Sequence, residues 1–353
     1  MKKIMGLVLV LMLSLSLFSG CTGGTGKNKV TDESKSENRN IVVYAPQGSG
    51  EFADWLVEQA KEQVNINVEF FGGSGGDLAD RLIAEKNNPQ ADVALGFVQL
   101  AMYQFVEEGV LEEYIPSWSK TLPDVYKGKN DMFNCMWQTP IIIAYNEDVM
   151  SEEEAPKSWL DLADSKYKNK YAIGRLGSQT TRAYLSGILW RFYDKSTGEI
   201  SQEGWDYLTK FFENSITLQE GQSLWADVAS GNIPMVLSYY LGVELNSKTN
   251  EVNIGYVNSQ GGTPIVSEGI ALVKGGSNTE VAKEYIEWFG SPKFMAEYAK
   301  KVGSVPVHPE AIEMCPEEIK EKATLFNAQE MDWAVLAEKS NSWIEKIQLE
   351  IAP

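Results

Sequence analysis

Two adjacent tyrosines, Tyr239 and Tyr240, are the first candidates for ligand chemistry. They follow an apolar run at residues 233–237 in the segment GNIPMVLSYYLG, and Gly242 then allows a turn. Such a run is typical of a strand buried on both faces, and ligands bind beyond the carboxyl ends of strands in open α/β sheets. The phenols could form hydrogen bonds with a polar ligand or coordinate a hard metal as phenolates. Two tyrosines at the edge of the core are the alternative.

Three glycine-rich turns with hydroxyl groups are the second set of candidates. Each turn precedes a predicted helix, where unpaired backbone amides form a ready anion site. The glycines would let a ligand approach the backbone, although they also shape tight turns, and a serine also serves as an N-cap. The candidate binding residues in these turns are Ser49, Gly50, Ser74, Gly75, Ser178, Gln179, Thr180 and Thr181.

Glu268 is a further candidate because it interrupts the apolar segment Ile265–Lys274. A carboxylate in such a segment is costly if it is buried unpaired, so we expect it to meet hydrogen-bond donors or water. An exposed place on an edge strand is the alternative. Trp137, from the apolar segment Asp131–Tyr145, completes the predicted binding residues.

The residue patterns of common enzymes are missing from the sequence. His308 is the single histidine and lies between two prolines, so neither a Ser-His-Asp triad nor a site of several histidines is supported. A carboxylate hydrolase is the enzyme class left open, but no pair among the 49 Asp and Glu residues is singled out. We therefore predict a protein that is not an enzyme and carries no cofactor.

The net charge of −18 limits the kinds of molecule that the protein can bind. Such a surface repels nucleic acid and anionic lipid, so we expect neither as a partner. A small anion is still compatible with it, because local donors can override the overall charge.

The N-terminus reads as an export signal. Residues 1–20 combine a basic start with an apolar stretch, and Leu17–Gly20 precedes Cys21 as in a bacterial lipobox. We predict a signal peptide over 1–20, lipidation of Cys21 and a flexible tether over 21–40; a plain secretory signal is the alternative. The protein would then be anchored by its lipid to the outer face of the cell membrane, or be periplasmic. Whether Cys135 and Cys315 pair stays open.

The remaining chain predicts a largely parallel α/β sheet. A strand, a loop and a helix follow one another three times between Ile41 and Glu108. A long apolar crossover at Thr139–Tyr145 leads to a second α/β region, and a return strand follows near Pro264–Val273. Helices are expected over Glu280–Phe289, Lys293–Lys300 and Asn327–Ile347.

Several segments together resemble the bacterial ABC-transporter solute-binding proteins, in the branch of ferric-iron, thiamine, phosphonate and hexose-phosphate binders. They are GGSGGDLADRLIAEKNNPQADVALG at 72–96, IIIAYNEDV at 141–149, residues 231–240, and GGTPIVSEGIALVKGG at 261–276. The resemblance implies a type II periplasmic-binding fold, in which two lobes joined by two crossover strands close around a ligand. It places lobe 1 at 41–140 and 268–353, and lobe 2 at 141–267. It also implies a monomer that serves a permease and ATPase complex.

The resemblance leaves the ligand open between three classes. Ferric binders have two adjacent tyrosines where Tyr239 and Tyr240 stand, but many also have a histidine where this chain has Gln47-Gly48-Ser49. Thiamine is disfavoured, since the stacking aromatic residues of those binders correspond roughly to Leu245 and Ser304. Phosphonate and sugar-phosphate binders use hydroxyl-bearing helix ends, which suits an oxyanion at residues 178–181 with Glu268 contacting the far end of the solute. A structural surface lipoprotein is the alternative of another class.

Overall fold

The computed structural model describes residues 38–218 and 222–352. The predicted signal peptide, the lipidation site Cys21 and most of the predicted tether lie outside these residues. No helix within the described ranges is long and apolar enough to cross a membrane.

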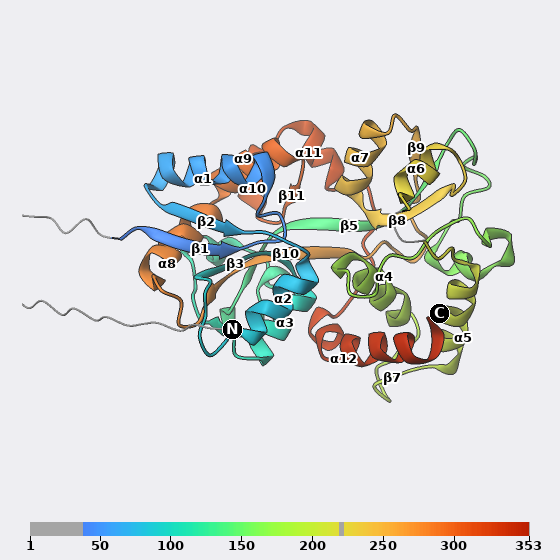
Figure 1. Ribbon diagram of the computed structural model, residues 1–353, viewed down its shortest axis with the longest axis horizontal. Helices are drawn as coiled ribbons and strands as arrows, with labels where there is room; N and C mark the ends of the chain where they lie inside the picture. The colour runs from blue at the N-terminus through green and yellow to red at the C-terminus, as the bar shows by residue number, and fades with distance from the viewer. Residues whose placement is uncertain (1–37, 219–221, 353) are drawn as a thin grey trace, which may run out of the picture. The chain divides into compact units, whose positions relative to one another are not determined.

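Strands and helices alternate through the N-terminal part of the chain (Figure 1). The strands are β1 (Asn40–Tyr44), β2 (Asn67–Phe71), β3 (Val93–Val98), β4 (Leu111–Glu112), β5 (Asn134–Asn146), β6 (Tyr193–Asp194), β7 (Glu199–Ile200), β8 (Met235–Tyr239), β9 (Ile254–Tyr256), β10 (Ile265–Val273) and β11 (Val305–Pro306). The helices are α1 (Gly50–Val64), α2 (Gly75–Ala84), α3 (Gln99–Glu107), α4 (Gln179–Trp190), α5 (Gln202–Asn214), α6 (Leu224–Ala229), α7 (Tyr240–Thr249), α8 (Thr279–Phe289), α9 (Pro292–Val302), α10 (Pro309–Met314), α11 (Glu317–Lys322) and α12 (Trp333–Lys346).

The three predicted strand-loop-helix units are confirmed. Strand β1 pairs in parallel with β2 and with β3, and α1, α2 and α3 follow the three strands. The apolar residues at helical spacing face inward, as Leu78 and Leu82 of α2 do. Because parallel strands end at the same edge of a sheet, the N-termini of the three helices are brought to that edge.

Strand β5 is the crossover that the apolar segment predicts. Up to Pro140 it pairs with β10 and β11, and from Ile141 onward it pairs with β8 and β9. In Figure 1, β5 and β10 run between one group of elements that contains β1–β3 and another that contains α4–α7 and β8. The lobe boundaries themselves stay a prediction.

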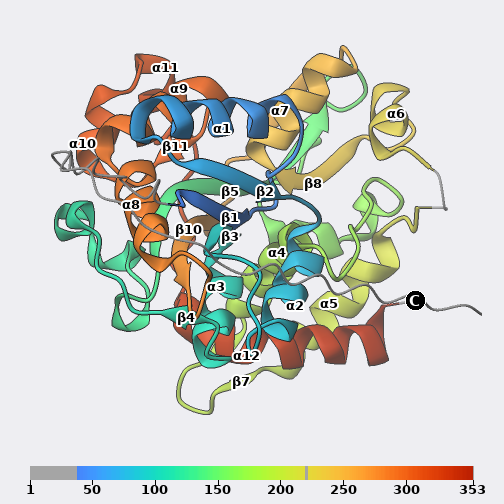
Figure 2. The same ribbon diagram turned by 60° about the vertical axis from the view of Figure 1, so that its left-hand side comes forward.

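A third segment runs beside the two crossover strands. The amide of Thr263 donates to Asn327 O at 2.7 Å, and the amide of Gln329 donates back to Thr263 O at 2.8 Å. The helix predicted over 327–347 is therefore wrong at its start: α12 begins at Trp333, where Asp332 caps its first amides. Helix α12 packs on α3 and on α4, and Figure 2 shows it running beneath both.

The two cysteines that the sequence left open are both buried and free. Burial raises the pKa of the Cys135 thiol, and a neighbouring negative charge on Glu268 adds to the effect. Cys135 and Cys315 therefore do not pair with each other, and both serve as apolar core residues.

Candidate ligand-binding site

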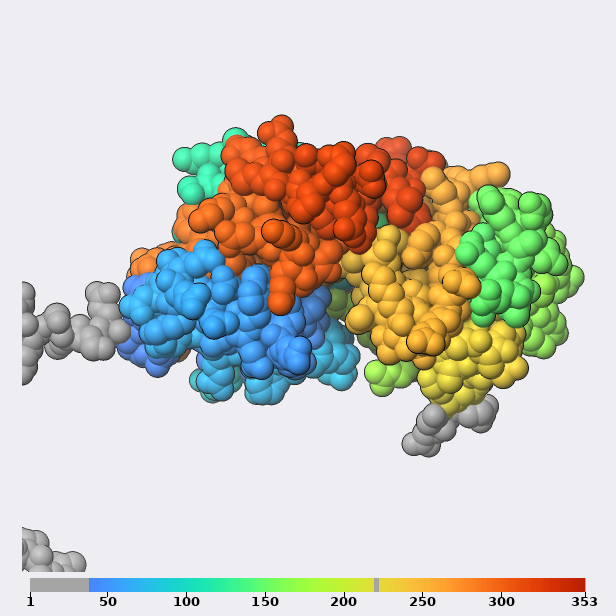
Figure 3. Space-filling model, turned by 90° about the horizontal axis from the view of Figure 1, so that it is seen from above, coloured from blue at the N-terminus to red at the C-terminus, as the bar shows by residue number. Residues whose placement is uncertain are grey.

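A cavity of about 320 Å³ brings together residues of β10, α2, α4 and the end of β8. Figure 3 shows the surface hollowed between the N-terminal segments, in blue, and the segments near residue 240, in yellow. Seven of the predicted binding residues line the cavity: Ser74, Gly75, Ser178, Gln179, Thr180, Tyr239 and Glu268. Their roles toward a ligand stay predictions.

Four helices begin at this cavity. The N-cap residues of α2, α3, α4 and α7 are Ser74, Val98, Ser178 and Tyr239, and all four line it. Each helix start carries unpaired backbone amides and the positive end of the helix dipole. Neither serine uses its hydroxyl to cap its own helix. Both hydroxyl groups are therefore available to a ligand, and the helix ends favour an anion.

Arg175 adds a full positive charge to the cavity wall. Its side chain is exposed, and its guanidinium forms no hydrogen bond or ion pair with the other residues that the structure describes. Arg175 was not among the residues predicted from the sequence, although a basic residue just before the Gly177-Ser178 turn is a signal for it. A free guanidinium beside hydroxyl groups suits a carboxylate, phosphate or phosphonate.

Glu268 lies buried at the cavity wall, with 7% of its surface exposed. Its carboxylate accepts hydrogen bonds from Thr139 Oγ1 at 2.7 Å and Gln47 Nε2 at 3.1 Å, and the Trp137 indole also donates to it. Burial raises the pKa of Glu268, and the three donors oppose that rise. The expectation that this glutamate meets donors is confirmed, and the exposed alternative is wrong.

The two adjacent tyrosines point to different places. Tyr239 lines the cavity, and burial together with the charge of Glu268 raises the pKa of its phenol. Tyr240 is a correction to the predicted site: it is buried in the core against Tyr256, and its hydroxyl donates to Glu244 at 2.8 Å. Tyr239 ends β8 and Tyr240 begins α7, so the two side chains point to different surroundings.

Four other predicted binding residues also lie off the cavity wall. Ser49 and Gly50 begin α1, which does not reach the cavity; Gln47, just before them, lines it instead. Trp137 is buried behind Glu268 and stacks on Tyr298 with ring centroids 4.5 Å apart. Thr181 is also buried, and its hydroxyl interacts with Tyr184 inside the second group of elements. The structure therefore places these four residues off the cavity wall, and their roles toward a ligand stay predictions.

Gly75 is a glycine because α2 and α4 approach closely at this point. A Cβ atom there would lie 2.7 Å from Cδ of Gln179, well inside contact distance. The prediction that the glycine-rich turns allow close approach therefore applies here, with a side chain of α4 as the neighbour.

The class of protein follows from comparison with known sequences. Residues 55–327 match the family model of the bacterial extracellular solute-binding proteins, and the chain belongs to this family. It is 43% identical over 311 residues to the probable ABC transporter periplasmic-binding protein y4fP of Sinorhizobium fredii, covering 88% of this chain and 86% of that relative.

Solved structures share the fold. The ferric binding protein from Campylobacter jejuni matches with a TM-score of 0.76 at 18% identity, over 88% of this chain and 99% of that one. AfuA from Actinobacillus pleuropneumoniae, a structure with fructose-6-phosphate bound, matches with a TM-score of 0.70 at 19% identity over the same shares of each chain. The two-lobed α/β fold of periplasmic binding proteins is thereby established. The protein is a solute-binding component of an ABC transporter.

Proposed function

We propose that this protein captures a small organic anion bearing a phosphate or phosphonate group and delivers it to an ABC importer without chemical turnover. The observation that carries the proposal is the convergence of four helix N-termini and the Arg175 guanidinium on one cavity. A tetrahedral oxyanion uses several such donors at once, whereas a bare cation uses none. Glu268 and Tyr239 would then contact the organic part.

Native mass spectrometry of the protein purified without refolding is the direct test. We expect a carried-over solute whose mass fits a phosphorylated or phosphonate compound. Ser178→Ala and Thr180→Val should each weaken its binding about ten- to a hundredfold, as expected for loss of a charge-assisted hydrogen bond. Tight binding of a neutral or cationic solute that neither substitution changes would overturn the proposal.

Ferric iron is the alternative with less support. Of the two tyrosines that suggested it, only Tyr239 lines the cavity, and Tyr240 is held by Glu244. Among the described residues there is also no group of three or more His, Cys, Asp or Glu side chains that could hold a metal. Addition of ferric ion without a competing chelator should leave the protein colourless. A visible band that disappears in Tyr239→Phe would favour iron instead.

Stabilisation of the folded protein by a ligand distinguishes a solute-binding protein from a structural surface lipoprotein. A solute at a hundred times its dissociation constant should raise the free energy of unfolding by about 2.7 kcal/mol. A thermal-shift screen of phosphate and phosphonate compounds that gives no stabilisation would contradict solute capture of this class. The lipid anchor and the monomeric state belong to the same proposal.

A further inference from the structure

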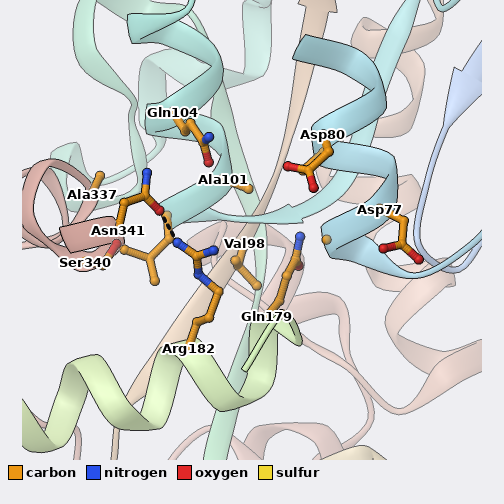
Figure 4. Close-up of a pocket in the computed structure, with 14 residues that line it drawn as sticks. Asp77, Asp80, Val98, Ala101, Gln104, Gln179, Arg182, Ala337, Ser340 and Asn341 are labelled. Carbon is orange, nitrogen blue, oxygen red and sulfur yellow. Dashed lines mark hydrogen bonds between the residues drawn. The ribbon is translucent and has the colours of Figure 1, made fainter. Parts of the chain in front are cut away.

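A second cavity, of about 120 Å³, adjoins the first one. Its walls come from α2, α3, α4 and α12 (Figure 4). Val98 and Gln179 line both cavities, so the two spaces meet at these side chains. The second cavity therefore lies beside the first one along α4, farther from the start of that helix.

Gln179 stands at the junction with an unused donor. Its Nε2 atom is buried and has no hydrogen-bond partner among the residues that the structure describes. A buried amide left unpaired costs free energy, and such a group in a binding protein is readily explained by a missing partner. A solute that passes from the first cavity to the second would supply an acceptor to this amide.

Arg182 follows Gln179 by one turn of α4 and presents its guanidinium to the second cavity (Figure 4). The one hydrogen bond that the structure gives its side chain is donated to Asn341 Oδ1 of α12. Asp80 of α2 lies across the cavity, close enough for its charge to act on Arg182 without forming an ion pair with it. Most donors of the guanidinium are thus left for another group.

The walls of the second cavity combine donors with acceptors. Arg182 can only donate and the Asp80 carboxylate can only accept, while the amides of Gln104 and Gln179 do both. The Asp77 carboxylate points away from Arg182 in Figure 4. A hydroxyl group, which accepts from the guanidinium and donates to the carboxylate, satisfies both at once. A charged group on the solute at this place would be repelled either by the Arg182 guanidinium or by the Asp80 carboxylate.

We propose that the second cavity is a specificity subsite for the hydroxyl-bearing tail of the solute, with Arg182 and Asp80 binding its hydroxyl groups. The inference rests on the proposed function, because the phosphate or phosphonate group must occupy the first cavity. It assigns the C-terminal helix a part in ligand choice, since Asn341 holds the guanidinium in place. Arg182 is then a specificity-determining residue, one helical turn beyond the anion.

Two probes that differ only in hydroxyl groups test the subsite: glycerol 3-phosphate and n-propyl phosphate, each titrated calorimetrically. The unchanged protein should bind glycerol 3-phosphate at least about tenfold more tightly. Arg182→Gln and Asp80→Asn should each bring this ratio close to one while n-propyl phosphate binds as before. Arg81→Gln is the matched control: Arg81 pairs with Glu85 on α2, outside both cavities, and the ratio should not change.

The outcomes separate the inference from the function on which it rests. Equal affinity for the two probes in the unchanged protein, or a ratio that survives both substitutions, overturns the subsite while phosphate binding stands. Failure of both probes to bind overturns the proposed function and the subsite together. If Arg182→Gln does not fold, Asp80→Asn alone tests the subsite. Asp80 is exposed on α2, so its replacement should not prevent folding.

Discussion

At the scale of single residues, Glu268 is the most unusual group of the cavity. It is a buried carboxylate that meets three neutral donors, from Gln47, Thr139 and Trp137, but no ion pair of the described residues involves it. Neutral donors compensate only part of the cost of burying a charge. The pKa of Glu268 is raised because the free-energy cost of burying its charge exceeds the stabilisation by these donors. A ligand hydroxyl or amino group would offset it.

Replacing Glu268 by glutamine should reduce the loss of stability at higher pH. The folded-state pKa is raised, so the folded protein binds this proton more tightly than the unfolded chain does. Stability is therefore lost as the pH rises from the ordinary glutamate pKa, about 4.3, through the folded pKa. Thermal unfolding of both proteins between about pH 4 and pH 7 should show Glu268→Gln gaining relative to the unchanged protein. A difference that is constant with pH would contradict this.

At the scale of elements, the N-cap serines of α2 and α4 differ from the N-cap serine of α9. Their N-cap serines do not cap, whereas Ser291 at the start of α9 accepts a hydrogen bond from the Phe294 amide at 3.3 Å. An N-cap hydroxyl that caps contributes about 1 kcal/mol to stability. A serine that does not cap its helix with its hydroxyl contributes little to stability in this way.

We therefore expect opposite effects from two serine substitutions. Ser178→Ala should change the free energy of unfolding by less than about 0.5 kcal/mol and weaken solute binding about tenfold. Ser291→Ala should lose about 1 kcal/mol of stability and leave binding unchanged. Urea unfolding and calorimetric titration measure the two effects. Equal losses of stability in the two variants would show that Ser178 also acts as a cap.

Arg191 forms hydrogen bonds with the segments that join the two groups of elements. From the end of α4 it donates to Gly261 O at 2.8 Å, to Gly262 O at 2.7 Å and to Gln329 Oε1 at 2.8 Å. Gln329 in turn donates to Gly187 O at 2.7 Å. The return crossover, the third connecting segment and α4 thus share one hydrogen-bonded cluster.

Loss of the Arg191 guanidinium should therefore be costly. Arg191→Met is expected to lower the free energy of unfolding by at least about 1.5 kcal/mol, because three hydrogen bonds to a charged group are removed. Arg81→Met, which breaks a surface pair with Glu85 and removes the charge that lies over the Phe71 and Tyr44 rings, should cost about 1 kcal/mol. Denaturant unfolding measures the loss of stability in each variant. Similar small losses in the two would contradict a stabilising role of the Arg191 guanidinium.

At the scale of the whole molecule, membership of the solute-binding family agrees with the way the chain crosses between its two groups of elements. Strands β5 and β10 cross, residues 327–329 run beside them, and α12 returns to contact α3 and α4. Both cavities are lined by elements of both groups. This is the geometry needed by a protein that holds its solute between two lobes.

Export and anchoring are the predictions that concern the molecule as a whole. Cys21 is the last of the four lipobox positions that the sequence matches, so radiolabelled fatty acid should be incorporated into the protein in cells. Labelling should be absent from Cys21→Ser, which cannot form the thioether. Unchanged labelling in that variant would refute lipidation at this cysteine.

The sequence by itself determined the family, the first three strand-loop-helix units and the crossover. Apolar periodicity and glycine-rich turns are local signals, so they were enough to predict the first three strand-loop-helix units and the crossover at β5. Glu268 could also be selected locally, because a carboxylate within an apolar segment needs donors wherever it lies. The serine-bearing turns before α2 and α4 were found in the same way.

Only the tertiary structure decided which of these groups meet. Helix α1 was predicted to reach the cavity and does not, although it follows a strand that ends at the same edge of the sheet as β2 and β3, whereas the starts of α3 and α7 do line it. Tyr239 and Tyr240 are separated because Tyr239 ends β8, where it pairs with Ile141, whereas Tyr240 begins α7 and packs in the core. Glu268 takes donors from residues 129 and 221 positions away, a separation that no local pattern can bridge.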